Sequence, residues 1–277
     1  MTGLYGSMQP ADSLYLSTRT HGAVFNLEYS PDGSVLTVAC EQTEVLLFDP
    51  ISSKHIKTLS EAHEDCVNNI RFLDNRLFAT CSDDTTIALW DLRKLNTKVC
   101  TLHGHTSWVK NIEYDTNTRL LVTSGFDGNV IIWDTNRMIR VLYLRSRCQG
   151  LHSEKWTCVY EFQEGAPMRH VSPRCSLRLT HCIEEANVGR GYIKELCFSP
   201  DGRMISSPHG FGIRLLGFDV NCSELVDCLP KEAGPLKEIR SLYSHNDVVL
   251  TTKFSPTHCQ IASGCLSGRV SLYQPKF

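Results

Sequence analysis

The chain has 277 residues, 42% of them hydrophobic and 21% charged, which is a globular composition with enough apolar residues for a sizeable core. Its 28 basic and 30 acidic residues leave a formal net charge of -2, so no overall field favours a nucleic acid or an anionic membrane as a partner. No apolar run approaches the roughly 18–20 residues that span a bilayer, and residues 1–12 lack a signal-peptide pattern, so we expect a cytoplasmic or nuclear protein.

The first segment, residues 1–18, is expected to close the last sheet of the fold. Ser13 to Thr18 has the alternating pattern of a strand, whereas the end of the chain, Tyr273 to Phe277, follows a third strand with no fourth behind it. Pairing of the two termini would remove an exposed sheet edge.

A strand pattern then recurs along the chain: an apolar residue, two further residues, a second apolar residue, one residue and an aromatic. Its five occurrences, the last one weakened, are Val24-Leu27-Tyr29, Val67-Ile70-Phe72, Val109-Ile112-Tyr114, Ile193-Leu196-Phe198 and Val249-Thr252-Phe254. The period of about 40–45 residues is typical of a β-propeller repeat. It predicts three regular repeats in residues 19–137 and two further repeats in residues 193–277.

The second repeat contains an apolar strand, Leu77 to Cys81, a polar turn and a strand that ends at Trp90. A buried indole N–H needs an acceptor, because leaving it unpaired costs about 1–3 kcal/mol. This stretch resembles WD-repeat proteins, and the resemblance implies a structural hydrogen-bonded relay. In the second and third repeats its members would be His63, Thr80, Asp84 and Trp90, and His105, Thr123, Asp127 and Trp133.

The outer repeats carry less of this pattern. They keep an upstream histidine, His21 or His245, in two cases, but they have no tryptophan at the closing position. The position of the aspartate is taken by Gln42, Gly210 and Ser267. We therefore expect these sheets to be held mainly by apolar packing.

The middle of the chain, residues 138–192, departs from the period. Ile139 to Leu144 is predicted as the outer strand of the third sheet, and Trp156 to Phe162 as the third strand of a fourth. Only Arg145 to Lys155 lies between them, which leaves no room for two strands. The prediction is an all-β fold, a single WD40 β-propeller over residues 1–277 with about five recognisable blades plus one truncated blade.

Enzymatic chemistry, metals and cofactors are not expected. The 13 cysteines have no Cys-x-x-Cys spacing, and several fall on predicted core strands, so we expect them to be reduced. His152 with Glu154, or His181 with Glu184 and Glu185, could form acid–base pairs, but solvated loops explain them more simply.

Trp90-Asp91-Leu92-Arg93 is more specific than the general repeat pattern. It resembles the WDxR box of the WD40 substrate receptors of the cullin-4 RING ubiquitin ligase. The resemblance covers residues 14–137 and 157–277, with 138–156 shortened and the lead of residues 1–12 too short for the helical segment that such receptors often place first. In the third repeat, Asn136 stands where the box has arginine.

The resemblance implies a partner-binding site formed by Arg93, Asp91 and Trp90, which would contact the damage-specific DNA-binding protein adaptor of the cullin-4 RING ligase. The simpler interpretation is a solvated arginine on a loop. The leading hypothesis is thus a non-catalytic receptor that brings an unidentified protein substrate to the ligase. The alternatives are a generic WD40 scaffold of an unrelated multiprotein assembly and, less favoured, a propeller enzyme.

Overall fold

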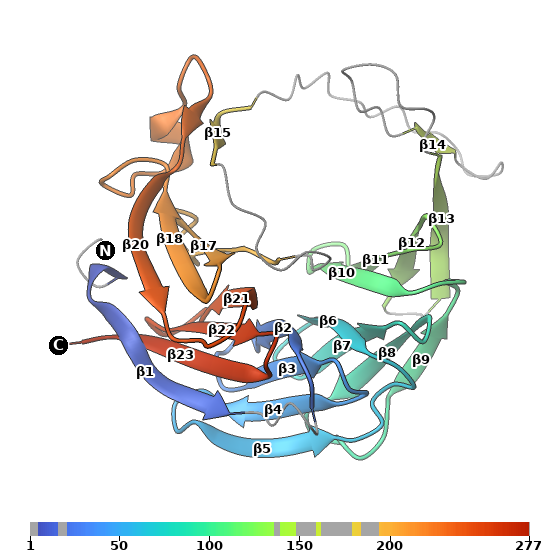
Figure 1. Ribbon diagram of the computed structural model, residues 1–277. Helices are drawn as coiled ribbons and strands as arrows, with labels where there is room; N and C mark the ends of the chain where they lie inside the picture. Colours follow the sequence, from blue (N-terminus) through green and yellow to red (C-terminus); the bar gives the residue numbers. More distant parts are fainter. Residues whose placement is uncertain are drawn as a thin grey trace. The chain divides into compact units, whose positions relative to one another are not determined.

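The computed structural model describes residues 5–15, 21–135, 139–147, 159–161, 179–183 and 194–276. Their regular structure is almost entirely β-strand, in antiparallel sheets of four or five strands and one short parallel pair, with a single 3-10 turn at Leu225–Cys228 (η1) (Figure 1). The prediction of an all-β fold is confirmed.

In the sheets of four or five strands, neighbouring strands pair antiparallel, and the first three of these sheets are meanders of consecutive strands. The first sheet consists of β2 (Val24–Tyr29), β3 (Leu36–Cys40), β4 (Val45–Asp49) and β5 (Lys54–Leu59). The second consists of β6 (Val67–Phe72), β7 (Leu77–Ser82), β8 (Thr86–Asp91) and β9 (Cys100–His103). The third consists of β10 (Val109–Asp115), β11 (Leu120–Gly125), β12 (Asn129–Asp134), β13 (Ile139–Arg147) and β14 (Val159–Glu161).

Two more sheets follow. The fourth consists of β16 (Cys197–Phe198), β17 (Met204–His209), β18 (Gly212–Gly217) and β20 (Lys237–Tyr243). The last consists of β21 (Val249–Phe254), β22 (Ile261–Cys265), β23 (Arg269–Pro275) and β1 (Met8–Tyr15). A short parallel pair joins β15 (His181–Cys182) to β19 (Gly234–Pro235).

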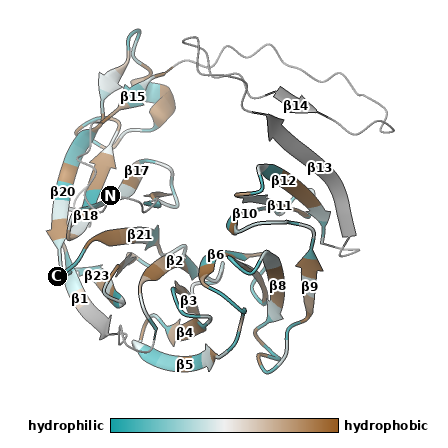
Figure 2. Ribbon diagram, turned by 45° about the vertical axis from the view of Figure 1, so that its right-hand side comes forward, coloured by the Kyte–Doolittle hydropathy of each residue, from teal (hydrophilic) through white to brown (hydrophobic). Residues whose placement is uncertain are grey.

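The first sheet is buried on both faces near its centre, because its middle strands are apolar at successive positions. All five residues of β3 are buried, and so are the first four of β4. The outer strand β5 has lysine, histidine and threonine side chains and is mostly exposed. Figure 2 shows this change from the hydrophobic colour of β4 to the hydrophilic colour of β5.

The chain forms two compact units, Met1–Ala62 with Arg178–Phe277, and His63–Leu177. In the first unit, apolar clusters join the fourth sheet to the last sheet and the last sheet to the first. In the second unit, one cluster joins the second and third sheets. The single domain expected for residues 1–277 stays a prediction.

The expected closing strand is present. β1 pairs antiparallel with β23, from Met8 opposite Pro275 to Tyr15 opposite Arg269, and thus becomes the fourth strand of the last sheet (Figure 1). The strand begins before Ser13, where the sequence pattern placed it, because apolar contacts lie further upstream. Met8 is fully buried, and the ring of Tyr5 meets that of Phe254 edge-on at 5.6 Å.

The third sheet confirms one prediction about the middle of the chain and corrects another. β13 is its outer strand, as expected. β14, however, was predicted as part of a separate truncated blade, and it pairs with β13 as a fifth strand of the same sheet. The reason is that a short connection between two strands favours antiparallel neighbours. Trp156 and Phe162, the ends of the predicted strand, lie outside the described residues.

The cysteines of the described ranges are thiols and not disulfides, and those of the core, such as Cys40 and Cys81, are packed within sheets. Among the described residues, we find no helix of the length and hydropathy required to cross a membrane.

Candidate functional site

The second sheet brings His63, Thr80, Asp84 and Trp90 together in one chain of hydrogen bonds. The indole Nε1–H of Trp90 donates to Thr80 Oγ1 at 3.0 Å, and His63 Nε2 lies 2.7 Å from the same hydroxyl. His63 Nδ1 lies 2.9 Å from the Asp84 carboxylate. Because a carboxylate only accepts, His63 Nδ1 carries a proton and donates it to Asp84. The indole is thus linked through three side chains to the turn.

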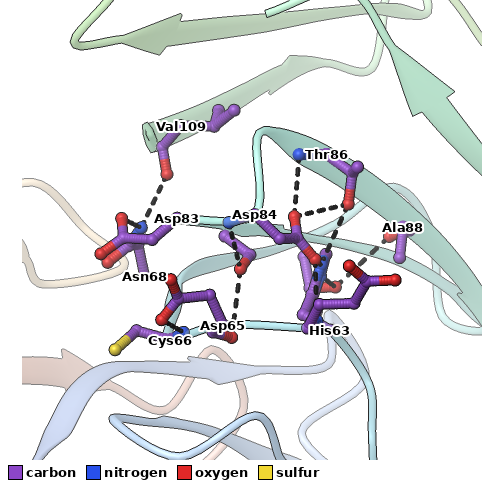
Figure 3. A network of polar contacts seen from close by, with 12 residues as sticks. His63, Asp65, Cys66, Asn68, Asp83, Asp84, Thr86, Ala88 and Val109 are labelled. Atoms are coloured by element: carbon purple, nitrogen blue, oxygen red, sulfur yellow. Dashed lines mark hydrogen bonds and ion pairs between the residues drawn. The ribbon is translucent and has the colours of Figure 1, made fainter. Parts of the chain in front are cut away.

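The Asp84 carboxylate organises the turn between β7 and β8 (Figure 3). It accepts the backbone N–H groups of Glu64 and Thr86 and the Thr86 hydroxyl. Burial by itself would raise the pKa of this carboxyl, but the hydrogen bond and charge of His63, together with the backbone donors, hold it well below its usual range. Asp84 is therefore ionised at neutral pH and keeps a proton on His63 Nδ1.

The third sheet repeats the arrangement. Trp133 Nε1–H donates to Thr123 Oγ1 at 3.0 Å, His105 Nε2 lies 2.8 Å from that oxygen, and His105 Nδ1 lies 2.9 Å from Asp127 Oδ2. The pKa of Asp127 is also lowered: burial raises it, but the backbone N–H groups and His105 prevail.

Two of the outer sheets contain polar contacts of their own besides the apolar packing that was expected for them. In the first sheet, His21 Nδ1 lies 2.5 Å from Glu44 Oε2, so a longer acid at another position replaces the missing aspartate. In the last sheet, His245 Nε2 lies 2.7 Å from Ser263 Oγ, which lies 3.0 Å from the Tyr273 hydroxyl. Serine and tyrosine thus replace threonine and tryptophan.

His245 differs from the other relay histidines in lacking an acid. Its Nδ1 is buried and has no hydrogen-bond partner among the described residues, and Ser267 stands where Asp84 stands in the second sheet. Burial, with a contribution from the Arg269 charge, lowers the pKa of His245 to about 4. The imidazole is therefore neutral over the physiological range.

The candidate partner-binding group lies just after β8. Arg93 Nε donates to Asp91 Oδ1 at 2.9 Å, and its terminal Nη2 donates to Oδ2 at 2.5 Å, so the guanidinium and carboxylate form a two-point pair. The Arg93 backbone N–H also donates to Asp91 Oδ1. This pairing lowers the pKa of the Asp91 carboxyl to about 2. The Arg93 side chain is 64% exposed, so a positioned cation faces solvent.

Trp90, the third residue predicted to bind a partner, is only 4% exposed. Its ring is stacked beside Phe78, and its N–H is used by Thr80. Little of the Trp90 surface is therefore open to a partner. Trp90 supports the Arg93–Asp91 pair by holding the end of β8 in place. Asn136 and Arg137 of the third repeat lie outside the described residues.

A second exposed group was missed by sequence reasoning. Trp108 and Phe126 are 46% and 63% exposed, and their ring centroids lie 5.6 Å apart. The Lys110 ammonium lies 4.8 Å from the Trp108 ring centroid and 2.7 Å from Asp83 Oδ1. Exposed tryptophan beside a cation is typical of interaction surfaces. The sequence signal that could have identified this group is the position of its two aromatic residues: Trp108 follows the relay histidine His105, and Phe126 precedes the relay aspartate Asp127.

Two alternative chemistries find little support in these residues. Asp65, Cys66 and Asp83 have ligand atoms close together, but the Lys110 ammonium already neutralises Asp83. His181, proposed as half of an acid–base pair, packs against Phe218 with the ring planes tilted and the centroids 5.4 Å apart. The other members of the proposed pairs, His152, Glu154, Glu184 and Glu185, lie outside the described residues.

The two exposed groups lie at opposite ends of the sheets in the second unit. Strand β8 starts at Thr86, beside Asp83 and Asp84, and ends at Asp91, beside Arg93. At about 3.3 Å per residue, these ends are roughly 15–20 Å apart. Lys110 binds Asp83, which ties Trp108 and Phe126 to the starting end. Partners at the two ends would therefore not compete for the same residues.

Comparison with known proteins identifies the repeats. The family model described as WD domain, G-beta repeat, matches residues 53–91, 96–134 and 236–274. With the antiparallel sheets described above, these matches put the fold in the WD40 β-propeller class.

The chain is also similar to curated proteins over its whole length. It is 61% identical over 412 residues to DDB1- and CUL4-associated factor 10 of Mus musculus, a match that covers 100% of this chain and 73% of that protein. The same protein of Homo sapiens is 61% identical, with 100% and 74% covered, and that of Danio rerio is 56% identical, with 100% and 79% covered. Because the match is longer than this chain's 277 residues, these relatives carry residues inside it that this chain lacks.

Proposed function

Since this chain belongs to the family of DDB1- and CUL4-associated factor 10, we propose that it is a substrate receptor of a cullin-4 RING ubiquitin ligase. In this role it binds the DDB1 adaptor at one end of its sheets and a protein substrate at the other. The observation that carries the proposal is the exposed Arg93–Asp91 pair at the end of a WD repeat.

Arg93 suits an adaptor contact because its geometry is set before binding. Asp91 holds one edge of the guanidinium through Nε–H and Nη2–H, while the remaining N–H groups bond to no protein atom in the described part of the chain. A planar cation in this state can donate to carbonyls or carboxylates of a partner with little loss of side-chain entropy. Arginines of this kind are frequent among the residues that dominate the free energy of an interface.

The substrate surface that we propose consists of Trp108, Phe126 and Lys110. A hydrogen bond from the Phe126 backbone N–H to the Trp108 carbonyl, 2.8 Å long, connects the two segments that carry the rings. Large aromatic side chains fixed in this way lose little conformational entropy when they become buried against another protein. The distance from Arg93 would allow adaptor and substrate to bind together.

The proposed receptor performs no covalent chemistry itself, and it acts in the cytoplasm or the nucleus. The thiol form of the cysteines in the described ranges is compatible with a reducing compartment. Catalysis belongs to the ligase that the receptor joins, and no cofactor or metal is part of the proposal.

The direct test is binding of purified DDB1 to the wild-type chain and to Arg93→Ala. We expect the substitution to weaken binding by about 10–100-fold, which corresponds to about 1–3 kcal/mol for an interfacial arginine. Arg203→Ala is the matched control, because Arg203 is also an exposed arginine paired with a carboxylate, that of Glu224 at 2.8 Å.

Each other outcome has a definite meaning. Equal binding by Arg93→Ala and wild type would show that the box is not the adaptor contact. If the wild-type chain captures no adaptor at all, the receptor proposal fails and the generic scaffold role becomes the better explanation.

A further inference from the structure

The connections at the starting end of β8 are acidic. In the second and third sheets, the connections at this end are residues 63–66, 83–85, 104–108 and 126–128. They contain no lysine or arginine and five carboxylates, those of Glu64, Asp65, Asp83, Asp84 and Asp127. The described connections at the Arg93 end contain one carboxylate and five basic side chains, in residues 73–76, 92–99 and 116–119. Charge is thus separated along the strands, and the end that carries the aromatic pair is the negative one.

Two of these carboxylates are open to a partner. Asp84 and Asp127 bind the relay histidines, and Asp83 binds Lys110. Glu64 and Asp65 are exposed, and neither forms an ion pair with a basic side chain of the described ranges. The carboxylates of Asp65 and Asp83 have oxygens within 4.8 Å of each other (Figure 3). Because Lys110 supplies one positive charge to this pair, a negative charge is left for a cation from outside the chain.

The rings beside these carboxylates already interact with a cation. The Lys110 ammonium lies 4.8 Å from the ring centroid of Trp108 and 5.4 Å from that of Phe126. A cation at such a distance is attracted to the negative face of an aromatic ring, and an arginine guanidinium can also stack on it. Both rings keep exposed surface, so they can contact a second cation or an apolar side chain.

Lys110 is poorly placed to bind an acidic partner. Its ammonium donates to Asp83 at 2.7 Å and to the Asn68 side-chain oxygen at 3.2 Å, and its side chain is only 27% exposed. An acidic segment would have to break these contacts and approach Glu64 and Asp65 against repulsion between like charges. A basic segment leaves the Lys110 contacts in place and meets opposite charge.

We propose that the substrate surface, extended by Glu64 and Asp65, recognises a basic segment of a protein substrate that combines arginine or lysine with apolar side chains. This inference rests on the proposed receptor function and adds the class of substrate. The apolar side chains cover Trp108 and Phe126, and the basic ones pair with the two exposed carboxylates. All of these groups belong to one compact unit, residues 63–177, so the surface needs no residue of the other unit.

The test is fluorescence anisotropy with two labelled peptides, one with arginine and leucine separated by glycine and one with glutamate in place of arginine. The wild-type chain is expected to bind the arginine peptide at least about tenfold more tightly. Asp65→Asn with Glu64→Gln should weaken this binding by about 3–10-fold, the combined effect of two exposed ion pairs. The matched control, Asp74→Asn with Asp115→Asn, removes the same charge at the other end and should bind like the wild type.

Lys110→Met distinguishes a basic from an acidic substrate. It removes a positive charge from the surface and leaves Asp83 with the Asn68 amide, so the arginine peptide should bind about 2–5-fold more tightly. Weaker binding of the arginine peptide to this variant, equal binding of the two peptides to the wild type, or equal weakening by the charge variant and its control would each overturn the proposal. If circular dichroism shows that Lys110→Met is unfolded, Lys110→Gln replaces it.

Binding of DDB1 to the same chains separates this inference from the receptor role. Glu64 and Asp65 lie at the other end of the strands from Arg93, so their variant should bind DDB1 like the wild type. A wild type that binds DDB1 but does not prefer the arginine peptide overturns the basic substrate class alone. A wild type that prefers the arginine peptide but binds no DDB1 overturns the receptor role and supports the surface for basic segments.

Discussion

The Thr80 hydroxyl shows how one small side chain can stabilise a whole sheet. It accepts the Trp90 indole N–H and contacts His63 Nε2, and all three side chains are buried. A buried donor or acceptor without a partner costs about 1–3 kcal/mol. The hydroxyl therefore stabilises the sheet mainly because its loss would leave the Trp90 indole N–H and His63 Nε2 unpaired.

Thr80→Val tests this interpretation, because valine keeps the shape of threonine without the hydroxyl. We expect the free energy of unfolding to fall by about 2–4 kcal/mol, since both the indole N–H and His63 Nε2 lose a partner in the core. Denaturant unfolding measures the change. Thr101→Val, on the half-exposed strand β9, is the control and should alter stability little; an equally small effect at position 80 would contradict the relay.

Ser267→Asp should restore the acid that the last sheet lacks. Aspartate at this position would accept the His245 Nδ1–H, as Asp84 does for His63, and we expect a gain of about 1 kcal/mol in the free energy of unfolding. Thermal unfolding is the measurement. The gain must vanish when His245→Asn is also present; an undiminished gain would show that the aspartate acts elsewhere.

The buried His245 also predicts how stability depends on pH. Its pKa falls from an ordinary value of 6.5 to about 4 on folding. Between these values the unfolded chain binds more protons than the folded chain, so this contribution to stability is complete above pH 6.5 and is lost as the pH falls toward 4. The loss is of the order of 3 kcal/mol. Unfolding of wild type and His245→Asn at both pH values measures it; parallel losses would rule out His245 as the source.

At the scale of elements, the N-terminal strand couples the two ends of the chain. β1 supplies the fourth strand of the last sheet, and Met8 is fully buried in the core that this sheet shares with the fourth. Without β1, the edge of β23 would present unpaired backbone groups. The last sheet is thus built from both termini, and its stability depends on residues far apart in sequence.

Deletion of residues 1–15 is expected to lower the melting temperature by many degrees, because it removes a whole strand and the buried Met8 side chain. Differential scanning calorimetry gives the value. Met8→Ala isolates the packing contribution and should cost about 2–5 kcal/mol. A deletion that shifts the melting temperature by only a degree or two would refute the closing role of β1.

The sequence allowed prediction of the elements whose residues recur. Thr80 and Trp90 have counterparts at the same spacing in the third repeat and His63 has one at nearly the same spacing, so the resemblance to WD repeats implied their proximity. Glu44 could not be identified, because the length of its side chain and the local turn decide that it reaches His21. The pairing of β14 with β13 likewise has no periodic signal in the sequence.

Exposure was the property least accessible from sequence. Trp108 and Phe126 are of residue types that are usually buried. They are exposed because no neighbouring segment of the described chain covers them. The same holds for Phe198, whose pattern is that of the buried Tyr29. Burial is a property of the surroundings, so a repeat pattern predicts it only where the adjoining sheet is present.

At the scale of the molecule, the proposed receptor has two surfaces with separate tasks. Arg93 lies at the end of β8, and the aromatic pair lies at its start, so the framework between them is a set of hydrogen-bonded strands. Substitution of exposed residues at either end should leave the relay and the core unchanged. Loss of binding at one end should therefore leave binding at the other intact, which distinguishes two sites from a general loss of structure.

The most direct test of two separate binding surfaces is quantitative affinity capture from cells. It compares three chains: wild type, Arg93→Ala, and Trp108→Ala with Phe126→Ala. The account predicts that Arg93→Ala loses DDB1 and the cullin-4 ligase but retains the other bound proteins, whereas the aromatic variant retains the ligase and loses substrates. Equal recovery of DDB1 with Arg93→Ala and wild type, or parallel loss of all partners in both variants, would contradict it.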